Sequence, residues 1–349
     1  MKICYLLETT DLWGGVRVVF DQARGLIKRG HDVVIRALTG SHAWYSYSLP
    51  IEYVRRLDAP FSMVPDVVIC TYWTTVTPGA GIRGPQKIHF CQGYEGDFSQ
   101  LKEKHSAIEE SYRMPIPKIT NGGWISKRLK EVFGKDLFPI YDIGQVVDTE
   151  LFRPPRFSLK NWIPLFLFRS LPPKILISGD YRFTVKGVAD ALHAVAILRG
   201  RGEKLHIVRV SSSNILPDEH QITPIDEFHV KVPSKEMASI YRKSDIFIAP
   251  SHSQEGFGLP FAEALASGVP SVATRIPSFL SFDDTHDYAL FVDENDPEAI
   301  ATGLQEMLHS PGLYKHYKRR GPYLIQKRFH LDSVAQELES ILKRHSRSF

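Results

Sequence analysis

Cysteine is scarce in this sequence: Cys4, Cys70 and Cys91 are the only three among 349 residues. They lie far apart, each in an apolar stretch that reads as a strand. This distribution excludes a disulfide framework or a cysteine metal site and favours buried thiols in a reducing compartment. Long hydrophobic runs are also missing, because no apolar stretch approaches the roughly 20 residues that a bilayer-spanning helix needs.

No targeting segment is evident either. Residues 1–8 read as a first strand and are too short for a signal peptide, so we expect a cytoplasmic protein, free or at the inner face of the membrane. With 43% hydrophobic and 23% charged residues, the composition is that of an ordinary globular protein. The length predicts two domains, and no nucleic-acid partner is expected.

The first half of the chain alternates between expected strands and helices. A helix over 16–29 has an apolar face and is closed by Gly30. Such alternation predicts a mostly parallel sheet covered on both faces, with ligands bound beyond the carboxyl ends of its strands. The expected strands are 3–7, 31–35, 66–70 and 87–92.

The most informative stretch is 246–268. An apolar strand over 246–250 is followed by a loop with Gly256 and Gly258, and then by a helix that we expect to start at Pro260 and stop at Gly268. Glycines let the backbone approach a ligand, and a helix start presents unpaired N–H groups and a partial positive charge. This segment therefore predicts a phosphate site.

Two carboxylates flank that site, Glu255 before the glycines and Glu263, which we expect in the first helical turn. Acids beside a phosphate would repel it, so they should face neutral partners such as sugar hydroxyls. A nucleotide sugar, with phosphates in the middle and diols at both ends, fits this arrangement. The alternative is a plain strand–loop–helix of a doubly wound sheet with two surface acids.

Residues 255–263, EGFGLPFAE, resemble the E-x7-E signature of retaining, nucleotide-sugar-dependent glycosyltransferases of family 4. The interior GFGLP and the trailing ALASGVP agree with that family as well as the two acids do. The resemblance implies an α/β protein of the GT-B fold, with two Rossmann-like doubly wound parallel-sheet domains facing across a cleft. It also implies a front-face mechanism in which the departing phosphate helps to deprotonate the acceptor, so that no protein base is required.

The resemblance further implies that no metal is obligatory and that no cofactor is needed beyond the nucleoside diphosphate sugar. The sequence agrees, since it has no Asp-x-Asp between strands, and the adjacent pair Asp283 and Asp284 reads as a surface loop. Residues 144–154 are similar to the motif that closes the family's first domain. We therefore expect the following domains: an acceptor-side domain (1–151), a linker (152–173), a donor-binding domain (174–328) and a terminal helix (329–349) that crosses back to the first domain in many relatives.

The linker has five prolines, no acid and a strongly apolar middle, 162–168. Packing of its aromatic side chains between the domains is the favoured interpretation. The alternative is an interfacial segment in contact with anionic lipid, which would suit a lipid-linked acceptor. The linker carries four positive charges, which equal the whole formal net charge of +4. They are those of Arg153, Arg156, Lys160 and Arg169.

The donor site is assigned by resemblance. Residues 179–187 are similar to the family's G-R-L-x-x-x-K-G loop but one residue longer, so Arg182 and Lys186 are expected to hold the diphosphate and stabilise its growing charge. Glu255 would hold the transferred sugar and Glu263 the ribose. The turn at 211–214 stands where relatives often have glycines. The remaining expected donor contacts are the backbone at Gly256, Phe257, Gly258 and Leu259 for the diphosphate, and at Val230 and Lys231 for the base.

Two loops of the first domain are also candidates. Gly14 and Gly15 are also expected among the donor-binding residues, because their loop is similar to the family's N-terminal GG loop, whose backbone approaches the donor diphosphate or the acceptor; a glycine pair alone fits a tight turn equally well. Gln92 stands where the family commonly carries a histidine that contacts the transferred sugar. Gln92 can hydrogen-bond a hydroxyl but cannot take up a proton. His89 should face the opposite side of the strand and is interpreted as structural.

The predicted function is thus a retaining hexosyl- or other glycosyltransferase acting on a glycan, lipid-linked or small-molecule acceptor, in cell-surface polysaccharide or glycoconjugate synthesis. Two alternatives remain. One is a catalytically weak, donor-binding regulatory partner of a transferase, which Gln92 in place of histidine would suit. The other is a GT-B sugar-nucleotide epimerase or hydrolase.

Overall fold

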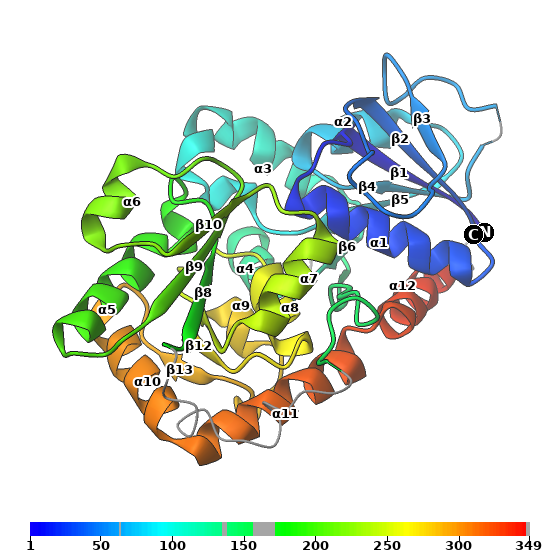
Figure 1. Cartoon of the computed structure of the whole chain (residues 1–349). Coiled ribbons are helices and arrows are strands. Elements are labelled where there is room, and N and C mark those ends of the chain that lie inside the picture. The colour runs from blue at the N-terminus through cyan, green and yellow to red at the C-terminus, as the bar shows by residue number, and fades with distance from the viewer. Residues whose placement is uncertain (63, 135–137, 156–171, 347–349) are drawn as a thin grey trace. The chain divides into compact units, whose positions relative to one another are not determined.

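The computed structural model describes residues 1–62, 64–134, 138–155 and 172–346 (Figure 1). The chain forms two compact units, one of residues 1–146 with 328–349 and one of residues 147–327. Each unit contains one sheet, and every strand pairing in both sheets is parallel. The predicted α/β class is therefore confirmed. Most of the linker, residues 156–171, lies outside the described residues.

The first unit has a seven-stranded sheet in the order β3-β2-β1-β4-β5-β6-β7. Its strands are β1 (Lys2–Thr9), β2 (Asp32–Thr39), β3 (Ile51–Tyr53), β4 (Val67–Cys70), β5 (Gln86–Cys91), β6 (Lys118–Thr120) and β7 (Ile140–Asp142). Its helices are α1 (Gly14–Lys28), α2 (Trp73–Gly81), α3 (His105–Arg113), α4 (Gly123–Phe133) and α12 (Leu331–Ser346), with short 3-10 helices η1 (Glu95–Asp97) and η2 (Ser99–Lys104).

Successive side chains of β1 point to opposite faces of this sheet, as in any β-strand, and both faces are covered by helices. Cys4 and Leu6 pack with Val76 of α2, whereas the Tyr5 hydroxyl donates a hydrogen bond to Gln22 Oε1 of α1, 3.2 Å away. All three cysteines are buried and free, which confirms the prediction of buried thiols.

The C-terminal helix α12 packs against α1, and Figure 1 shows the red and blue helices side by side. The two backbones approach closely at Gly25, where a Cβ would lie 2.7 Å from that of Ala335. An ion pair closes the same contact, with Arg29 Nη2 2.6 Å from Glu339 Oε2. Residues 328–349 are therefore part of the first unit.

The second unit has a six-stranded sheet in the order β10-β9-β8-β11-β12-β13. Its strands are β8 (Lys174–Ser178), β9 (His206–Ser211), β10 (Glu227–Val230), β11 (Ile246–Ala249), β12 (Ser271–Thr274) and β13 (Leu290–Val292). Its helices are α5 (Val188–Gly200), α6 (Pro217–Ile222), α7 (Ser234–Lys243), α8 (Leu259–Ala266), α9 (Pro277–Leu280), α10 (Pro297–His309) and α11 (Pro311–Arg328), and the short η5 (Thr184–Lys186) precedes α5.

Strand β11 shows how helices cover both faces of this sheet. Ile246 and Ile248 pack in one cluster with residues of α5 and α10. Phe247 points the other way and meets Tyr241 of α7, with ring centroids 6.0 Å apart. An uninterrupted apolar strand is what burial on two faces requires.

Several expected element ends are confirmed and two are corrected. Asp296 followed by Pro297 in the sequence predicts a capped helix start, and helix α10 is capped in this way, since Asp296 Oδ1 accepts a hydrogen bond from the Ala299 amide at 2.9 Å and Pro297 opens the helix. The expected loop through Gly15 is shorter, because α1 already begins at Gly14. Glu263 lies in the second turn of α8, not the first. Among the described residues, no helix combines the length and apolar character that crossing a membrane requires.

Candidate functional site

Strand order in the second unit singles out one position at the carboxyl edge of its sheet. From β8 the chain proceeds to β9 on one side, and from β11 it proceeds to β12 on the other, while β8 and β11 are neighbours. The loops that follow β8 and β11 therefore diverge, and ligands of doubly wound sheets bind at such a switch point. These loops are residues 179–187 and 250–258, the two that carry the sequence motifs.

The two loops touch through their backbones. Gly187 has φ of 59°, and a Cβ at this position would lie 1.9 Å from the Pro250 carbonyl oxygen. Only glycine fits here, for both conformational and steric reasons. A hydrogen bond joins the same two loops two residues away from this contact, where the His252 amide donates to the Val185 carbonyl at 2.8 Å. The Lys-Gly pair of the motif is thus fixed against the second loop.

The charged groups of the two motifs also meet. Lys186 Nζ lies 2.6 Å from Glu255 Oε2, and the Ser251 hydroxyl donates to the same oxygen at 3.2 Å. Glu255 is buried, at 9% exposure. The structure therefore joins the residue expected to bind diphosphate with the residue expected to bind sugar, although 69 positions separate them in the sequence.

Two further contacts hold the Glu255 loop, and neither was anticipated from the sequence. His252 Nε2 lies 2.8 Å from Asp190 Oδ2 of α5. The Ser253 amide donates to Glu294 Oε2, which follows β13, at 2.7 Å. These partners lie 62 and 41 residues away, so no local motif marks them.

Helix α8 starts at the same edge and points its N-terminus toward the loop that precedes it. Gly258 caps the helix with φ of 82°, and a Cβ there would lie 2.2 Å from the Phe279 ring. Phe257 is buried against Phe282, with centroids 4.7 Å apart. The aromatic packing therefore fixes the backbone of 256–259 where the helix presents its partial positive charge.

Glu263 lies on α8 below this N-terminus. It is only 4% exposed, and its Oε2 accepts a hydrogen bond from the Tyr241 hydroxyl at 3.2 Å. The carboxylate is thus held from the α7 side. The carbonyl of Pro260 accepts from the same hydroxyl at 2.9 Å, which ties the first turn of α8 to α7.

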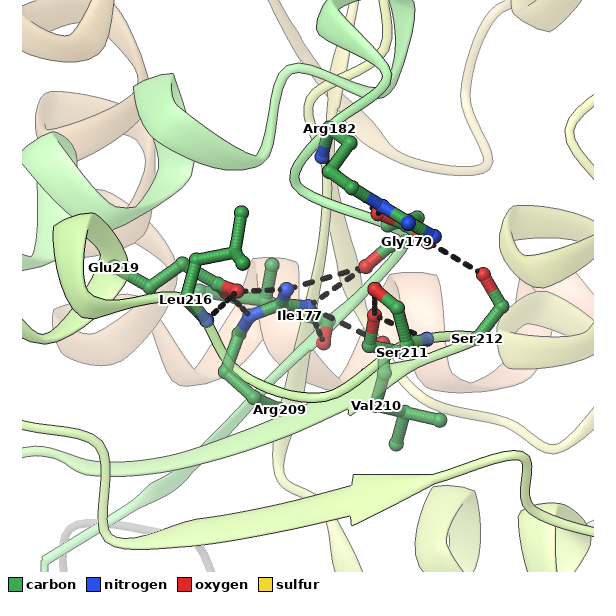
Figure 2. A network of polar contacts seen from close by, with 11 residues as sticks. Ile177, Gly179, Arg182, Arg209, Val210, Ser211, Ser212, Leu216 and Glu219 are labelled. Carbon is green, nitrogen blue, oxygen red and sulfur yellow. Dashed lines mark hydrogen bonds and ion pairs between the residues drawn. The ribbon is translucent and has the colours of Figure 1, made fainter.

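Arg182 binds Asp180, the residue directly after Gly179. Its Nε donates to Asp180 Oδ1 at 3.0 Å and its Nη2 to Oδ2 at 2.8 Å. The Ser212 hydroxyl donates to Oδ2 at 2.7 Å (Figure 2). Arg182, and then Ser212, hold the pKa of Asp180 well below its usual range. No role for Asp180 was predicted from the sequence.

A buried ion pair lies at the root of this loop. Arg209 of β9 is fully buried, and its Nη2 lies 2.6 Å from Glu219 Oε2 of α6. Both Nη atoms donate to the Gly179 carbonyl at 3.1 Å, and Nη1 also donates to the Ile177 carbonyl at 3.1 Å (Figure 2). The end of β8 is thus anchored where the loop 179–187 begins.

The expected base-binding backbone lies at the end of the edge strand β10. Val230 is 38% exposed, and Lys231 has an unusual positive φ of 50°. The Lys231 amide donates a hydrogen bond to the Ser211 carbonyl at 2.9 Å. The backbone at these two residues is therefore near the surface and held to the end of β9.

Of the candidates of the first unit, Gly14 and Gly15 come after β1, which lies beside β4 at the switch point of this sheet, whereas Gln92 comes after β5, the next strand. Gly14 and Gly15 form the first turn of α1, and Gln92 Nε2 donates a hydrogen bond to the Gly15 carbonyl at 3.1 Å. His89 is fully buried, with its ring centroid 4.7 Å from that of Tyr112. A side chain with no exposure agrees with the structural interpretation of His89, and burial also holds its pKa well below the usual value.

Comparison with known proteins gives three kinds of match. Residues 172–310 match a family model described as "Glycosyl transferases group 1". Among curated proteins, the chain is 29% identical over 207 residues to MMP alpha-(1->4)-mannosyltransferase of Mycolicibacterium hassiacum, covering 57% of this chain and 46% of that protein. It is 30% identical over 203 residues to D-inositol 3-phosphate glycosyltransferase of Xylanimonas cellulosilytica, covering 53% and 46%. The matches thus span about half the length of these relatives.

Solved structures match over the whole chain. Sucrose-phosphate synthase from Thermosynechococcus elongatus has a TM-score of 0.79 at 15% identity, covering 99% of both chains. Anabaena HepE in complex with UDP and glucose has a TM-score of 0.78 at 14% identity, covering 98% and 99%. At such identities the likeness concerns the fold, and it confirms two Rossmann-like units of the GT-B type.

Proposed function

Because residues 172–310 match the family model of the glycosyl transferases of group 1, we propose that this protein moves a sugar from a nucleoside diphosphate sugar to an acceptor. We further propose family 4 membership and retention of the anomeric configuration. The single observation that carries the proposal is the pairing of Lys186 with Glu255 at the switch point of the second unit. This pair places a cation for phosphate beside a carboxylate for hydroxyl groups.

Each member of the pair would exchange its partner when a donor binds. The Lys186 ammonium would turn to the diphosphate, aided by the N-terminus of α8. Glu255 would accept hydrogen bonds from hydroxyls of the transferred sugar. Fixed positive charge at this point stabilises the negative charge that grows on the leaving diphosphate, which is a large catalytic effect in a preorganised site.

The other assigned residues complete the donor site within the second unit. Glu263 would accept hydrogen bonds from the ribose diol, and the backbone of Val230 and Lys231 would face the base. The leaving phosphate takes the acceptor proton in this proposal, so no protein base and no metal ion are required. Activity that survives exhaustive chelation with EDTA would support metal independence; loss restored by a divalent cation would contradict it.

The first unit would bind the acceptor, with Gly14 and Gly15 after β1 and Gln92 after β5. A glycan or a lipid-linked acceptor in polysaccharide or glycoconjugate synthesis, on the cytoplasmic side, is proposed. Contact of 152–173 with anionic membrane is a further proposal. Deletion of 162–168 would then lower binding to phosphatidylglycerol vesicles, and unchanged binding would assign this segment to packing.

The nucleotide is best identified by binding. HepE, a structural neighbour, has been solved with UDP and with UDP-glucose, so uridine diphosphate is the first candidate. Thermal shift with UDP, GDP, ADP and dTDP should show selective stabilisation by one of them, because a ligand that binds only the folded state raises the unfolding temperature. No stabilisation by any of the four would contradict the proposal.

Product mass separates the proposed reaction from its alternatives. A transferase makes an acceptor heavier by one sugar residue, whereas an epimerase yields only an isomeric donor. A regulatory partner would bind the donor without acceptor-dependent turnover. Only the first outcome, measured with purified protein and a panel of acceptors, supports the proposal.

A further inference from the structure

The cations of the donor loop 179–187 are each compensated by a carboxylate of the same unit. Arg182 pairs with Asp180 and Lys186 pairs with Glu255. The four charges cancel at a place where the proposed ligand carries at least two negative charges. The two pairs differ, however, in what could release them when a donor arrives.

Glu255 has an alternative partner in the proposed complex, because sugar hydroxyls can replace the Lys186 ammonium. Asp180 has a different set of contacts. It is 5% exposed, and it accepts hydrogen bonds from the Ser212 hydroxyl and from the Arg182 amide at 3.1 Å as well as from the guanidinium. Three donors from two loops therefore fix this carboxylate.

The backbone that carries Asp180 is fixed too. The preceding carbonyl, that of Gly179, accepts hydrogen bonds from both terminal nitrogens of the buried Arg209, and Arg209 is held by Glu219 (Figure 2). A shift of the loop that moved Asp180 away from the site would break this buried network, which is costly. The negative charge of Asp180 therefore stays in place.

Asp180 also occupies the part of Arg182 that suits a phosphate best. The edge formed by Nε and Nη2 binds carboxylates and phosphates with two parallel hydrogen bonds, and both nitrogens donate to Asp180 here. The Arg182 side chain is accessible to a ligand, since 57% of it is exposed. Its positive charge is nevertheless neutralised by Asp180.

We propose that Asp180 lowers the affinity of the donor site for nucleoside diphosphates in two ways. It occupies the Nε and Nη2 edge of Arg182, and it keeps a fixed negative charge in the donor loop. This inference rests on the proposed function. Its consequence is weaker binding of the nucleoside diphosphate product, which favours product release. Asp180 therefore acts against tight binding of the diphosphate.

The test is calorimetric titration of the Asp180→Asn variant with UDP, or with whichever of the four diphosphates binds the wild type. Asparagine keeps the shape and a hydrogen-bond acceptor but removes the charge. We expect the Kd for the diphosphate to fall about tenfold, since one charge at close range contributes on the order of that factor even after screening. The gain should shrink as salt is raised, and the Kd for the uncharged nucleoside should not change.

The matched control is Asp226→Asn. Asp226 pairs with Arg199 at 3.0 Å, in the same unit, but it precedes β10 and so lies at the opposite edge of the sheet from the donor loop. The Asp226→Asn substitution removes one negative charge from an Asp–Arg pair, as Asp180→Asn does, and we expect it to leave the affinity for the diphosphate unchanged. Equal tightening by both variants would show a general effect of net charge and would overturn the inference.

The double variant Asp180→Asn, Arg182→Ala keeps the test decisive. The double variant should bind the diphosphate more weakly than Asp180→Asn does, because it lacks the released guanidinium, and equal binding by the two variants would overturn the role assigned to Arg182. Should Asp180→Asn fail to fold, Asp180→Ser carries the same prediction. Equal or weaker diphosphate binding by the folded Asp180 variant overturns the inference alone, whereas a wild type that binds none of the four diphosphates overturns the proposed function and the inference with it.

Discussion

The two units of this protein have nearly the same architecture and different chemistry at the equivalent place. Both sheets are parallel, and both have a switch point, between β1 and β4 and between β8 and β11. In the second unit an ion pair, Lys186 with Glu255, bridges the loops at this point. In the first unit the nearest counterpart is a neutral amide, that of Gln92 directly after β5, which donates to the Gly15 carbonyl at the start of α1.

The difference teaches that the fold fixes where a ligand binds and the side chains decide which one. A doubly wound sheet directs its loops to the carboxyl edge in either unit. Charged groups there suit a phosphate, whereas an amide and exposed backbone suit hydroxyl groups. The four predictions below test this contrast, in order of decreasing effect.

The largest effect is expected for Glu255→Ala. Sugar transfer should fall by at least about a hundredfold, because this carboxylate is proposed to hold the reacting sugar. Diphosphate affinity should be equal to or tighter than that of the wild type, since Lys186 loses the partner that neutralises it. Steady-state kinetics and titration with the diphosphate measure both. Parallel loss of transfer and binding would show that Glu255 supports the loop and does not contact sugar.

The next largest effect is expected in a comparison of two glycine substitutions, Gly187→Ala in the second unit and Gly14→Ala in the first. Gly187 has a positive φ and no room for a Cβ beside Pro250, whereas nothing lies within 4 Å of a Cβ at Gly14. We expect Gly187→Ala to lower stability by about 2 kcal/mol or more and Gly14→Ala to change it by less than about 1 kcal/mol. Urea unfolding measures this, and similar values would mean that the two loops do not differ in tightness.

A smaller effect is expected for Gln92→Ala, which removes the hydrogen bond to Gly15. Transfer should fall about tenfold, the usual worth of one such bond, with diphosphate affinity unchanged. Gln92→Glu serves as the comparison, because it retains the shape and loses the donor that faces the Gly15 carbonyl. A change in diphosphate affinity in Gln92→Ala would contradict the assignment of this residue to the acceptor.

The smallest effect concerns the dependence of stability on pH. One glutamate in each unit has a shifted pKa, and the two shifts have opposite signs. Burial raises the pKa of Glu95 in the first unit to about 7. The folded state then holds a proton that the unfolded state releases above pH 4.5, so this contribution to stability is lost as pH rises from about 4.5 to 7. In the second unit Lys174 lowers the pKa of Glu227 to about 2, and that contribution is lost as pH falls from about 4.5 to 2.

Thermal unfolding of Glu95→Gln and Glu227→Gln, each compared with the wild type across these ranges, measures the two contributions. The wild type should lose its advantage over Glu95→Gln on going from pH 5 to pH 8. It should lose its advantage over Glu227→Gln on going from pH 5 to pH 2. A difference between wild type and variant that stays constant across its range would rule out the corresponding pKa shift.

Much of the local structure could be predicted from the sequence. The helix that follows β11 was expected from Pro260 and Gly268, and α8 indeed begins beside Pro260 and ends just before Gly268, which has a positive φ. The cap at Asp296 was likewise predicted correctly. Prediction was less accurate at Gly14, where the helix starts earlier, because an extended N-cap at Trp13 makes glycine acceptable as the first helical residue.

The partners within the site could not be predicted in the same way. Resemblance assigned Arg182 to a phosphate, and the structure shows it bound to Asp180, an acid that occupies the place directly after Gly179. The contact of His252 with Asp190 had no signal in the sequence at all. Hydrogen-bond partners depend on where distant loops meet, and a motif describes only its own loop.

The sequence by itself determined the alternation of strands and helices, the glycine loop over 250–258 that leads into α8, and the positions of Glu255 and Glu263, because periodicity and the placement of glycine and proline act over a few residues. Only the tertiary structure decided that Lys186 would neutralise Glu255 and that Asp180 would hold Arg182. The physical reason is strand order: placing β11 beside β8 brings together loops that are far apart along the chain, and the free energy of a charge depends on what lies within a few ångströms of it.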